Sequence, residues 1–206
     1  IRASGGMNFS EEQLGRFAAS PSQTETEKMN NAETAVRKAI AASDELNNRG
    51  IRVFAQGSYR NRVNVRSESD VDIAVVCDDT FYWMGGPPGA SLESLGYGPG
   101  TYDYDDFRRD VIAALRSYFA SGQVHVGNKA IDVSGNTYRV EADVVPFFQH
   151  KRFHEDGTHI VGVEMRPTSG GRIVNWPDQH YANGVAKNTA TGRAFKGCVR
   201  ILKALR

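Results

Sequence analysis

The 206-residue chain lacks three features of secreted, membrane and duplex-binding proteins, because it has few cysteines, no long apolar run and no excess of basic residues. Its two cysteines, Cys77 and Cys198, lie far apart and outside any CxxC or Cys/His cluster, which argues against a disulfide framework and a structural zinc site. It has no run of eighteen apolar residues, so we predict no membrane partner. Lys plus Arg number 25 against 24 for Asp plus Glu, without the basic excess of proteins that hold duplex nucleic acid. We therefore expect a reduced, cytoplasmic protein without strong duplex nucleic-acid binding.

The overall composition is typical of a globular domain. Hydrophobic residues make up 40% of the chain and charged residues 24%, and the length suffices for one sizeable core. Residues 1–6 lack the apolar segment of a signal peptide, so we interpret them as a remnant ahead of Met7. Residues 85–100 contain six glycines and three prolines, which predicts a long, exposed, irregular loop.

We expect an α+β fold in which a mixed, mostly antiparallel sheet is packed against helices. A capping box at Ser10–Gln13 opens a short first helix that ends near Pro21. We divide the chain into a core over 7–176 and the beginning of a helical C-terminal lobe over 177–206. Further helices are predicted over 24–48, 103–120, 177–188 and 193–206, and strands over 51–56, 71–77, 124–126, 130–133, 137–145 and 161–165.

Three aspartates lie where apolar strands are predicted. Asp70 and Asp72 are two residues apart at the start of the apolar run 71–77, so we expect their carboxylates on one face. Asp143 lies within the predicted strand 137–145. Carboxylates that converge in such a setting repel one another and lose hydration unless a cation lies between them. Carboxylate oxygens suit Mg²⁺ or Mn²⁺, so the pattern predicts a metal site.

A second group of residues has the chemistry to bind phosphate. Gly57 and Ser58 directly follow the first predicted strand, where backbone amides and a hydroxyl can meet a phosphate. Lys196 and Lys203 lie seven residues apart on one predicted helix, on a basic stripe opposite an apolar one. A solvated helix face explains these lysines equally well. Asn183 shares a predicted helix face with His180 and Lys187, where it serves either to read a base or to form a turn.

These motifs resemble those of polymerase-β-like nucleotidyltransferases. More narrowly, the chain resembles the CD-NTases, relatives of cyclic GMP-AMP synthase and of oligoadenylate synthase, and among them the bacterial clade E enzymes. The resemblance covers most of the chain, although family members are longer, so we expect part of the helical lobe to be absent. It is carried by Gln56-Gly57-Ser58-Tyr59-Arg60-Asn61, Ser69-Asp70-Val71-Asp72, Asp143, the stretch from Asn175 to Asn188, and Phe195-Lys196 with Val199-Arg200.

The resemblance implies a polymerase-β-like core and a two-metal nucleotidyl transfer from nucleoside triphosphates. Asp70, Asp72 and Asp143 would be the catalytic residues and the ligands of two Mg²⁺ or Mn²⁺ ions. The product would be a cyclic di- or trinucleotide second messenger for bacterial anti-phage signalling, and the family allows for a regulatory protein partner. Nucleotide binding would involve Gln56, Gly57, Ser58, Asn183, Lys196 and Lys203.

Three other functions stay open from the sequence. A linear nucleotidyltransferase acting on RNA or on a protein would use the same acids with another acceptor site. A catalytically inactive nucleotide-binding protein would be expected to lose an acid, yet all three are present. A sensor of duplex nucleic acid is disfavoured by the balanced charge.

Overall fold

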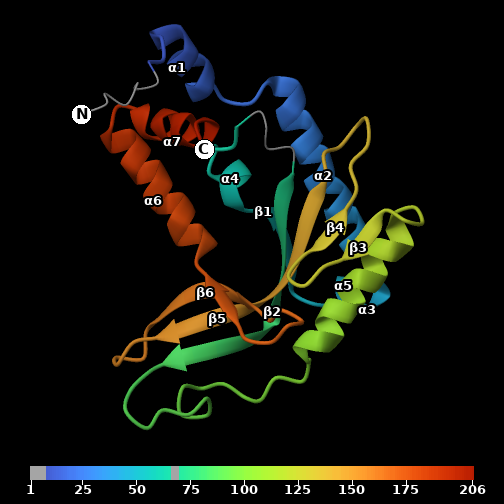
Figure 1. The fold of residues 1–206 in the computed structure, drawn as a ribbon. Coiled ribbons are helices and arrows are strands. Elements are labelled where there is room, and N and C mark those ends of the chain that lie inside the picture. The colour runs from blue at the N-terminus through green and yellow to red at the C-terminus, as the bar shows by residue number, and fades with distance from the viewer. Residues whose placement is uncertain (1–7, 66–69) are drawn as a thin grey trace.

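A computed structural model describes residues 8–65 and 70–206 of the chain. The predicted remnant 1–6, Met7 and Ser69 lie outside the described residues. The described chain folds around one seven-stranded mixed sheet in the order β1-β2-β5-β4-β3, with β6 pairing with β5 and β7 with β6 (Figure 1). Only β2 and β5 pair in parallel among these strands, and the other pairs are antiparallel. The prediction of an α+β fold with a mixed sheet is confirmed.

The strands differ greatly in length, and the two longest form the parallel centre of the sheet. The first part of β5 pairs with β4 and its second part pairs with β6, so two strands lie in succession along one edge of β5. The strands are β1 (Ile51–Ala55), β2 (Val71–Gly85), β3 (Val124–Val126), β4 (Ile131–Val133), β5 (Ala142–Phe153), β6 (His159–Met165) and β7 (Ile173–Asn175).

The helices form two groups, one packed against the sheet and one beyond its end. Helices α2 and α5 contact each other and the central strands, whereas α6 leads away from β7 and α7 returns across α1 (Figure 1). No helix among the described residues is long and apolar enough to cross a bilayer. The helices are α1 (Glu11–Ala18), α2 (Gln23–Ala41), α3 (Asp44–Asn47), α4 (Gly57–Arg60), α5 (Tyr104–Tyr118), α6 (Pro177–Ala190) and α7 (Ala194–Ala204).

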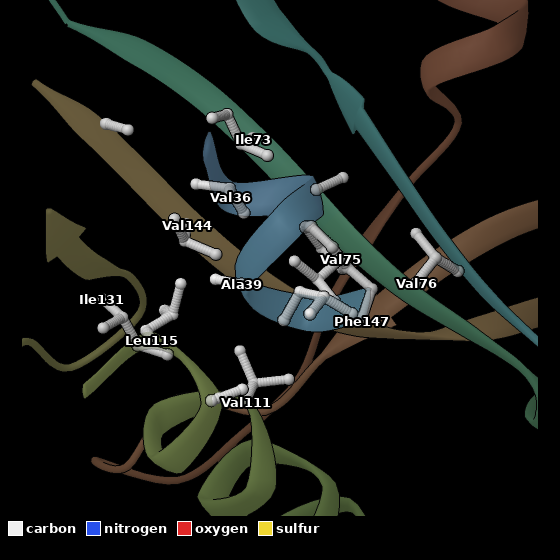
Figure 2. Close-up of a cluster of buried hydrophobic side chains, with 14 of the residues drawn as sticks. Val36, Ala39, Ile73, Val75, Val76, Val111, Leu115, Ile131, Val144 and Phe147 are labelled. Atoms are coloured by element: carbon white, nitrogen blue, oxygen red, sulfur yellow. The ribbon is translucent and has the colours of Figure 1, made fainter. Parts of the chain in front are cut away.

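The hydrophobic core lies between the sheet and the pair α2 and α5. Figure 2 shows side chains of both helices meeting side chains of β2, β4 and β5 in one cluster. Burial of a Val, Leu or Phe side chain stabilises the fold by roughly 1.5–3 kcal/mol, which makes this face the main source of stability. Cluster members are Val36 and Ala39 of α2, Val111 and Leu115 of α5, Ile73, Val75 and Val76 of β2, Ile131 of β4, and Val144 and Phe147 of β5.

Several predicted elements have the wrong limits. The helix predicted over 24–48 ends at Ala41, because Ser43 is extended and precedes a new short helix that carries the buried Leu46. The strand predicted over 137–145 begins only at Ala142. Before it, Asn136 Oδ1 accepts hydrogen bonds from the backbone N–H groups of Tyr138 (2.9 Å) and Arg139 (3.0 Å), and such local bonds compete with strand pairing.

The strand predicted over 71–77 is the first half of a longer one. After an irregularity between Cys77 and Phe81, β2 resumes its pairing with β5 and ends at Gly85. Residues 86–100 contain no helix or strand, as the glycine and proline content predicts. Tyr97 anchors this loop to the end of the sheet through ring contacts with Phe81 (4.8 Å) and Phe153 (5.9 Å).

The last helix, α7, is amphipathic, as its spacing predicts. Lys196 and Lys203 line the same cavity as Phe195 on α7. Arg200 instead reaches α1, where its Nε donates to the Ala18 carbonyl at 2.6 Å. The basic side chains of α7 are therefore divided between a cavity and a helix contact, because α1 packs against α7 and occupies part of its surface.

Candidate active site

The acids lie at one end of the central strands. In the parallel pair β2 and β5, Asp72 is the register partner of Asp143. In the antiparallel pair β4 and β5, Asp132 is also the register partner of Asp143. Register partners on adjacent strands point to the same side of a sheet, so these three carboxylates form a row across three strands. The intervening neighbours Val71, Ile73 and Val144 point into the core instead.

Electrostatics show that the acids act on one another. The pKa of Asp143 is raised from an ordinary 3.8 to about 6, first by burial and then by the charges of Asp132, Asp72 and Asp70. Asp70 precedes β2 and is exposed, whereas Asp72 and Asp143 are half-buried. The structure therefore brings the three predicted acids into one electrostatic group.

Asp132 belongs to this group and was not predicted from the sequence. It lies between the buried Ile131 and Val133 in a strand of three residues. The pattern of an acid between two apolar residues is the same one that singled out Asp72 and Asp143. The register of β4 against β5 gives Asp132 its place beside Asp143, and sequence alone does not contain that register.

The start of helix α4 lies against Asp72 of the acidic row. Gln56 caps the helix and its backbone N–H donates to the Asp72 carbonyl at 2.8 Å. Gly57 has a φ of +63°. A Cβ atom added to Gly57 would lie 2.1 Å from Asp72 Oδ2, a distance that real atoms do not tolerate. Glycine is needed here for both its backbone conformation and its lack of a side chain.

A cavity of about 800 Å³ opens beside this contact, between α4, α6 and α7. Five of the six residues predicted to bind nucleotide line it, namely Gly57, Ser58, Asn183, Lys196 and Lys203. Gln56 is not among the lining residues. Helix α6 contributes the face predicted from its spacing, and the residues not predicted as binding include Asn61, Val63, His180, Gly184, Lys187, Phe195 and Val199.

The cavity has a positive end. Burial lowers the pKa of Lys196, and the neighbouring charges of Arg62 and Arg200 lower it further. Cations that repel one another in this way provide a favourable place for a polyanion. The described lining residues include no acid of the row, but Gly57, which lies against Asp72, and the lysines of α7 line this cavity from different elements.

The donor chemistry of the acidic row fits a divalent cation. Carboxylate oxygens are the ligands that Mg²⁺ and Mn²⁺ prefer, and a cation would remove the repulsion that raises the pKa of Asp143. Within residues 8–65 and 70–206, no group of three or more His, Cys, Asp or Glu side chains is close enough to hold a metal by itself. Mg²⁺ usually keeps waters and binds substrate phosphates beside one or two carboxylates, so the row requires such additional ligands.

Comparison with known proteins decides the family. No protein-family model matches the chain. The cyclic dipyrimidine nucleotide synthase CdnE of Legionella pneumophila is 42% identical over 205 residues, which are 97% of this chain and 69% of that protein. This chain belongs to the CdnE group, clade E of the CD-NTase nucleotidyltransferases. Enzymes of this family generally use divalent metal ions.

Two solved CdnE structures support the membership. The Elizabethkingia meningoseptica cyclic dinucleotide synthase with GTP and Apcpp has a TM-score of 0.78 at 38% identity, covering 96% of this chain and 66% of that one. The Rhodothermus marinus c-UMP-AMP synthase with Apcpp and Upnpp has a TM-score of 0.83 at 29% identity, covering 95% and 66%. The chain spans about two thirds of the length of these relatives.

Proposed function

We propose that this CdnE chain catalyses nucleotidyl transfer between nucleoside triphosphates and forms a cyclic di- or trinucleotide. The observation that carries the proposal is the contact of Gly57 with Asp72, which joins the acidic row to the cavity lined by Ser58, Lys196 and Lys203. This arrangement offers metal-binding carboxylates and phosphate-binding groups within one site. Such a product would act as a second messenger in bacterial defence against phage, as family membership suggests.

Each group has a role in the proposed reaction. The hydroxyl oxygen of one nucleotide forms a bond to the α-phosphorus of another, the bond from that phosphorus to the bridging oxygen breaks, and pyrophosphate leaves. Asp143, which lies beside Asp72 in the strand register, would accept the hydroxyl proton. Ser58 and the Gly57 amide hold the β- and γ-phosphates, while Lys196 and Lys203 bind the end of the triphosphate. A second transfer in the opposite sense closes the ring.

Metal binding is the second part of the proposal. Asp70, Asp72 and Asp143 would hold two Mg²⁺ or Mn²⁺ ions together with substrate oxygens. Bound ions supply positive charge that stabilises the attacking and leaving oxygens. Without them, several carboxylates would face a triphosphate, and like charges repel strongly where water is partly excluded.

The names of the relatives differ in the products that they give. The three relatives above are named for dipyrimidine, cyclic dinucleotide and UMP-AMP products. Relatives that resemble this chain are therefore named for different products. Asn183 in the cavity wall is a residue whose amide would contact a base edge.

Product analysis tests the proposed reaction. The protein is incubated with all four nucleoside triphosphates and Mg²⁺ or Mn²⁺, and then with each triphosphate omitted in turn. We expect a phosphatase-resistant product that disappears when one or two triphosphates are omitted and in the Asp72→Asn variant. A product that forms only when RNA or protein is added, and that remains attached to this acceptor, would indicate a linear transferase instead. Binding of triphosphate without any product would indicate an inactive nucleotide-binding protein.

Thermal melting tests the metal requirement separately. Triphosphate at about a hundred times its dissociation constant should stabilise the native state by about 2.7 kcal/mol. For a chain of this length that is a rise in Tm of roughly 5–10 °C. We expect this rise in Mg²⁺ and its loss in EDTA. An equal rise in both would show that the carboxylates do not hold bridging metal ions.

A further inference from the structure

We propose that a second cavity, of about 730 Å³, binds a nucleotide at a site distinct from the transfer site. The segment around α4 contributes to both cavities with different side chains. Gly57, Ser58 and Asn61 line the transfer cavity, whereas Tyr59, Arg60 and Arg62 line the second one. Helix α6 is divided in the same way, since its Tyr181 lines only the second cavity.

The second cavity has the size and composition of a ligand site. Its volume is within the range of roughly 300–1,000 Å³ that small-molecule sites occupy. Its wall consists of two arginines, two tyrosines and four further polar residues besides Pro21, and among the described lining residues none is acidic. A surface with cations and no lining carboxylate favours an anion.

Only one of the two Nη groups of Arg60 forms a hydrogen bond among the described residues. Its Nη2 donates to Asp178 Oδ1 at 2.6 Å, while its Nη1 is buried and has no hydrogen-bond partner among the described residues. A buried donor without a partner is unfavourable, and a ligand oxygen would supply the missing acceptor. Arg60 therefore points to a ligand independently of the composition of the cavity.

Arg62 adds positive charge that the described part of the chain does not neutralise. No ion pair among the described residues involves Arg62. Its charge also acts on Lys196 together with that of Arg200, so the region has an excess of cations. A phosphate group matches the donor geometry of a guanidinium and would relieve this repulsion.

The remaining wall suits a planar base. The Arg60 guanidinium carbon lies over the Tyr181 ring, 5.2 Å from its centre, and both residues line the cavity. Asn64 is 3% exposed, and its Nδ2 donates to Met29 Sδ at 3.6 Å, a weak acceptor. Ring surfaces and amides beside two arginines are the groups that recognise a base attached to a phosphate.

Calorimetric titration with AMP in EDTA tests this site without depending on nucleotidyl transfer. Arg62 has a φ of +55°, a conformation that asparagine tolerates, so Arg62→Asn removes the charge with little strain. We expect Arg62→Asn to weaken AMP binding at least tenfold and Arg62→Lys to keep most of it. Tyr181→Leu should also weaken binding, and because Tyr181 is 42% exposed this change leaves the core intact. Lys38→Gln, an exposed change on α2, should bind AMP as the wild type does.

Two further variants separate this proposal from the proposed function. Ser58→Ala and Asp72→Asn alter the transfer site, and both should bind AMP in EDTA with unchanged affinity. Inorganic phosphate should bind at least tenfold more weakly than AMP, because it lacks the base. The proposal is overturned if AMP does not bind, if Arg62→Asn binds as the wild type does, if Ser58→Ala abolishes binding, or if phosphate binds as tightly as AMP.

Discussion

Replacing Asp143 by asparagine should stabilise the metal-free protein while abolishing nucleotidyl transfer. Burial and the charges of Asp132, Asp72 and Asp70 raise the pKa of Asp143 from 3.8 to about 6. A tenfold change in an acidity constant corresponds to about 1.4 kcal/mol, so the ionised carboxylate would cost about 3 kcal/mol if it were fully shielded from solvent. Asp143 is only half-buried, and screening by water reduces this cost to about 1–2 kcal/mol.

The sign of the effect depends on pH. Because the folded-state pKa is above the unfolded value, the native protein binds this proton more tightly, and wild-type stability falls as pH rises from about 4 to about 6. The amide that replaces the carboxyl carries no charge at any pH, so Asp143→Asn removes this loss. The gain in unfolding free energy of Asp143→Asn over the wild type should therefore be close to zero at pH 4 and fully present at pH 8.

Thermal melts in EDTA at pH 4 and pH 8 measure this difference. A gain of about 1–2 kcal/mol at pH 8 corresponds to a rise in Tm of roughly 2–8 °C for a chain of this length. Asp156→Asn is the matched control. Hydrogen bonds from the Thr158 hydroxyl and backbone N–H lower the pKa of Asp156, so this substitution should change Tm at pH 8 in the opposite direction. A fall in Tm at pH 8, or an equal rise at both pH values, would refute the reasoning about the acidic row.

Three other changes should have distinct effects. Gly57→Ala should lose transfer activity and destabilise the fold by more than Gly89→Ala in paired urea melts, because both glycines have positive φ but only the first contacts Asp72. Arg200→Met should reduce hydrogen-exchange protection in α1, and Arg200→Lys should restore only part of it, because the guanidinium donates to the carbonyls of both Ala18 and Arg62. In native protein, one thiol should react with a disulfide reagent: Cys198 is exposed, whereas Cys77 is fully buried and its pKa is raised by burial, so Cys198→Ser should abolish the reaction until denaturant is added.

Local patterns made the acids and the glycine turn predictable from the sequence. An aspartate beside an apolar run and a glycine after a strand are signals carried by a few adjacent residues, so Asp72 and Gly57 could be identified without any tertiary information. The helical spacing of α6 also predicted that His180, Asn183 and Lys187 share a face, and all three line one cavity.

Long-range pairing was not predictable in the same way. The parallel register of β2 and β5 places Asp72 beside Asp143, and the register of β4 adds Asp132. Similarly, the fully buried His150 Nδ1 lies 2.8 Å from Glu164 Oε2, a pair that only the β5–β6 hairpin brings together. The composition of a single segment does not determine strand registers or hairpin partners. Candidate residues could therefore be identified from the sequence, but not the residues that lie beside them in the fold.

The packing of α1 on α7 has a consequence for the order of folding. The hydrogen bond from Arg200 to Ala18 closes a separation of 182 residues, so α1 leaves the ribosome long before its partner helix exists. Contacts of such high sequence separation are costly in loop entropy and form late. The sheet and its helices α2 and α5 can therefore assemble around their own core first. Because α7 supplies Lys196 and Lys203, the transfer cavity is completed in the same final step that docks α1.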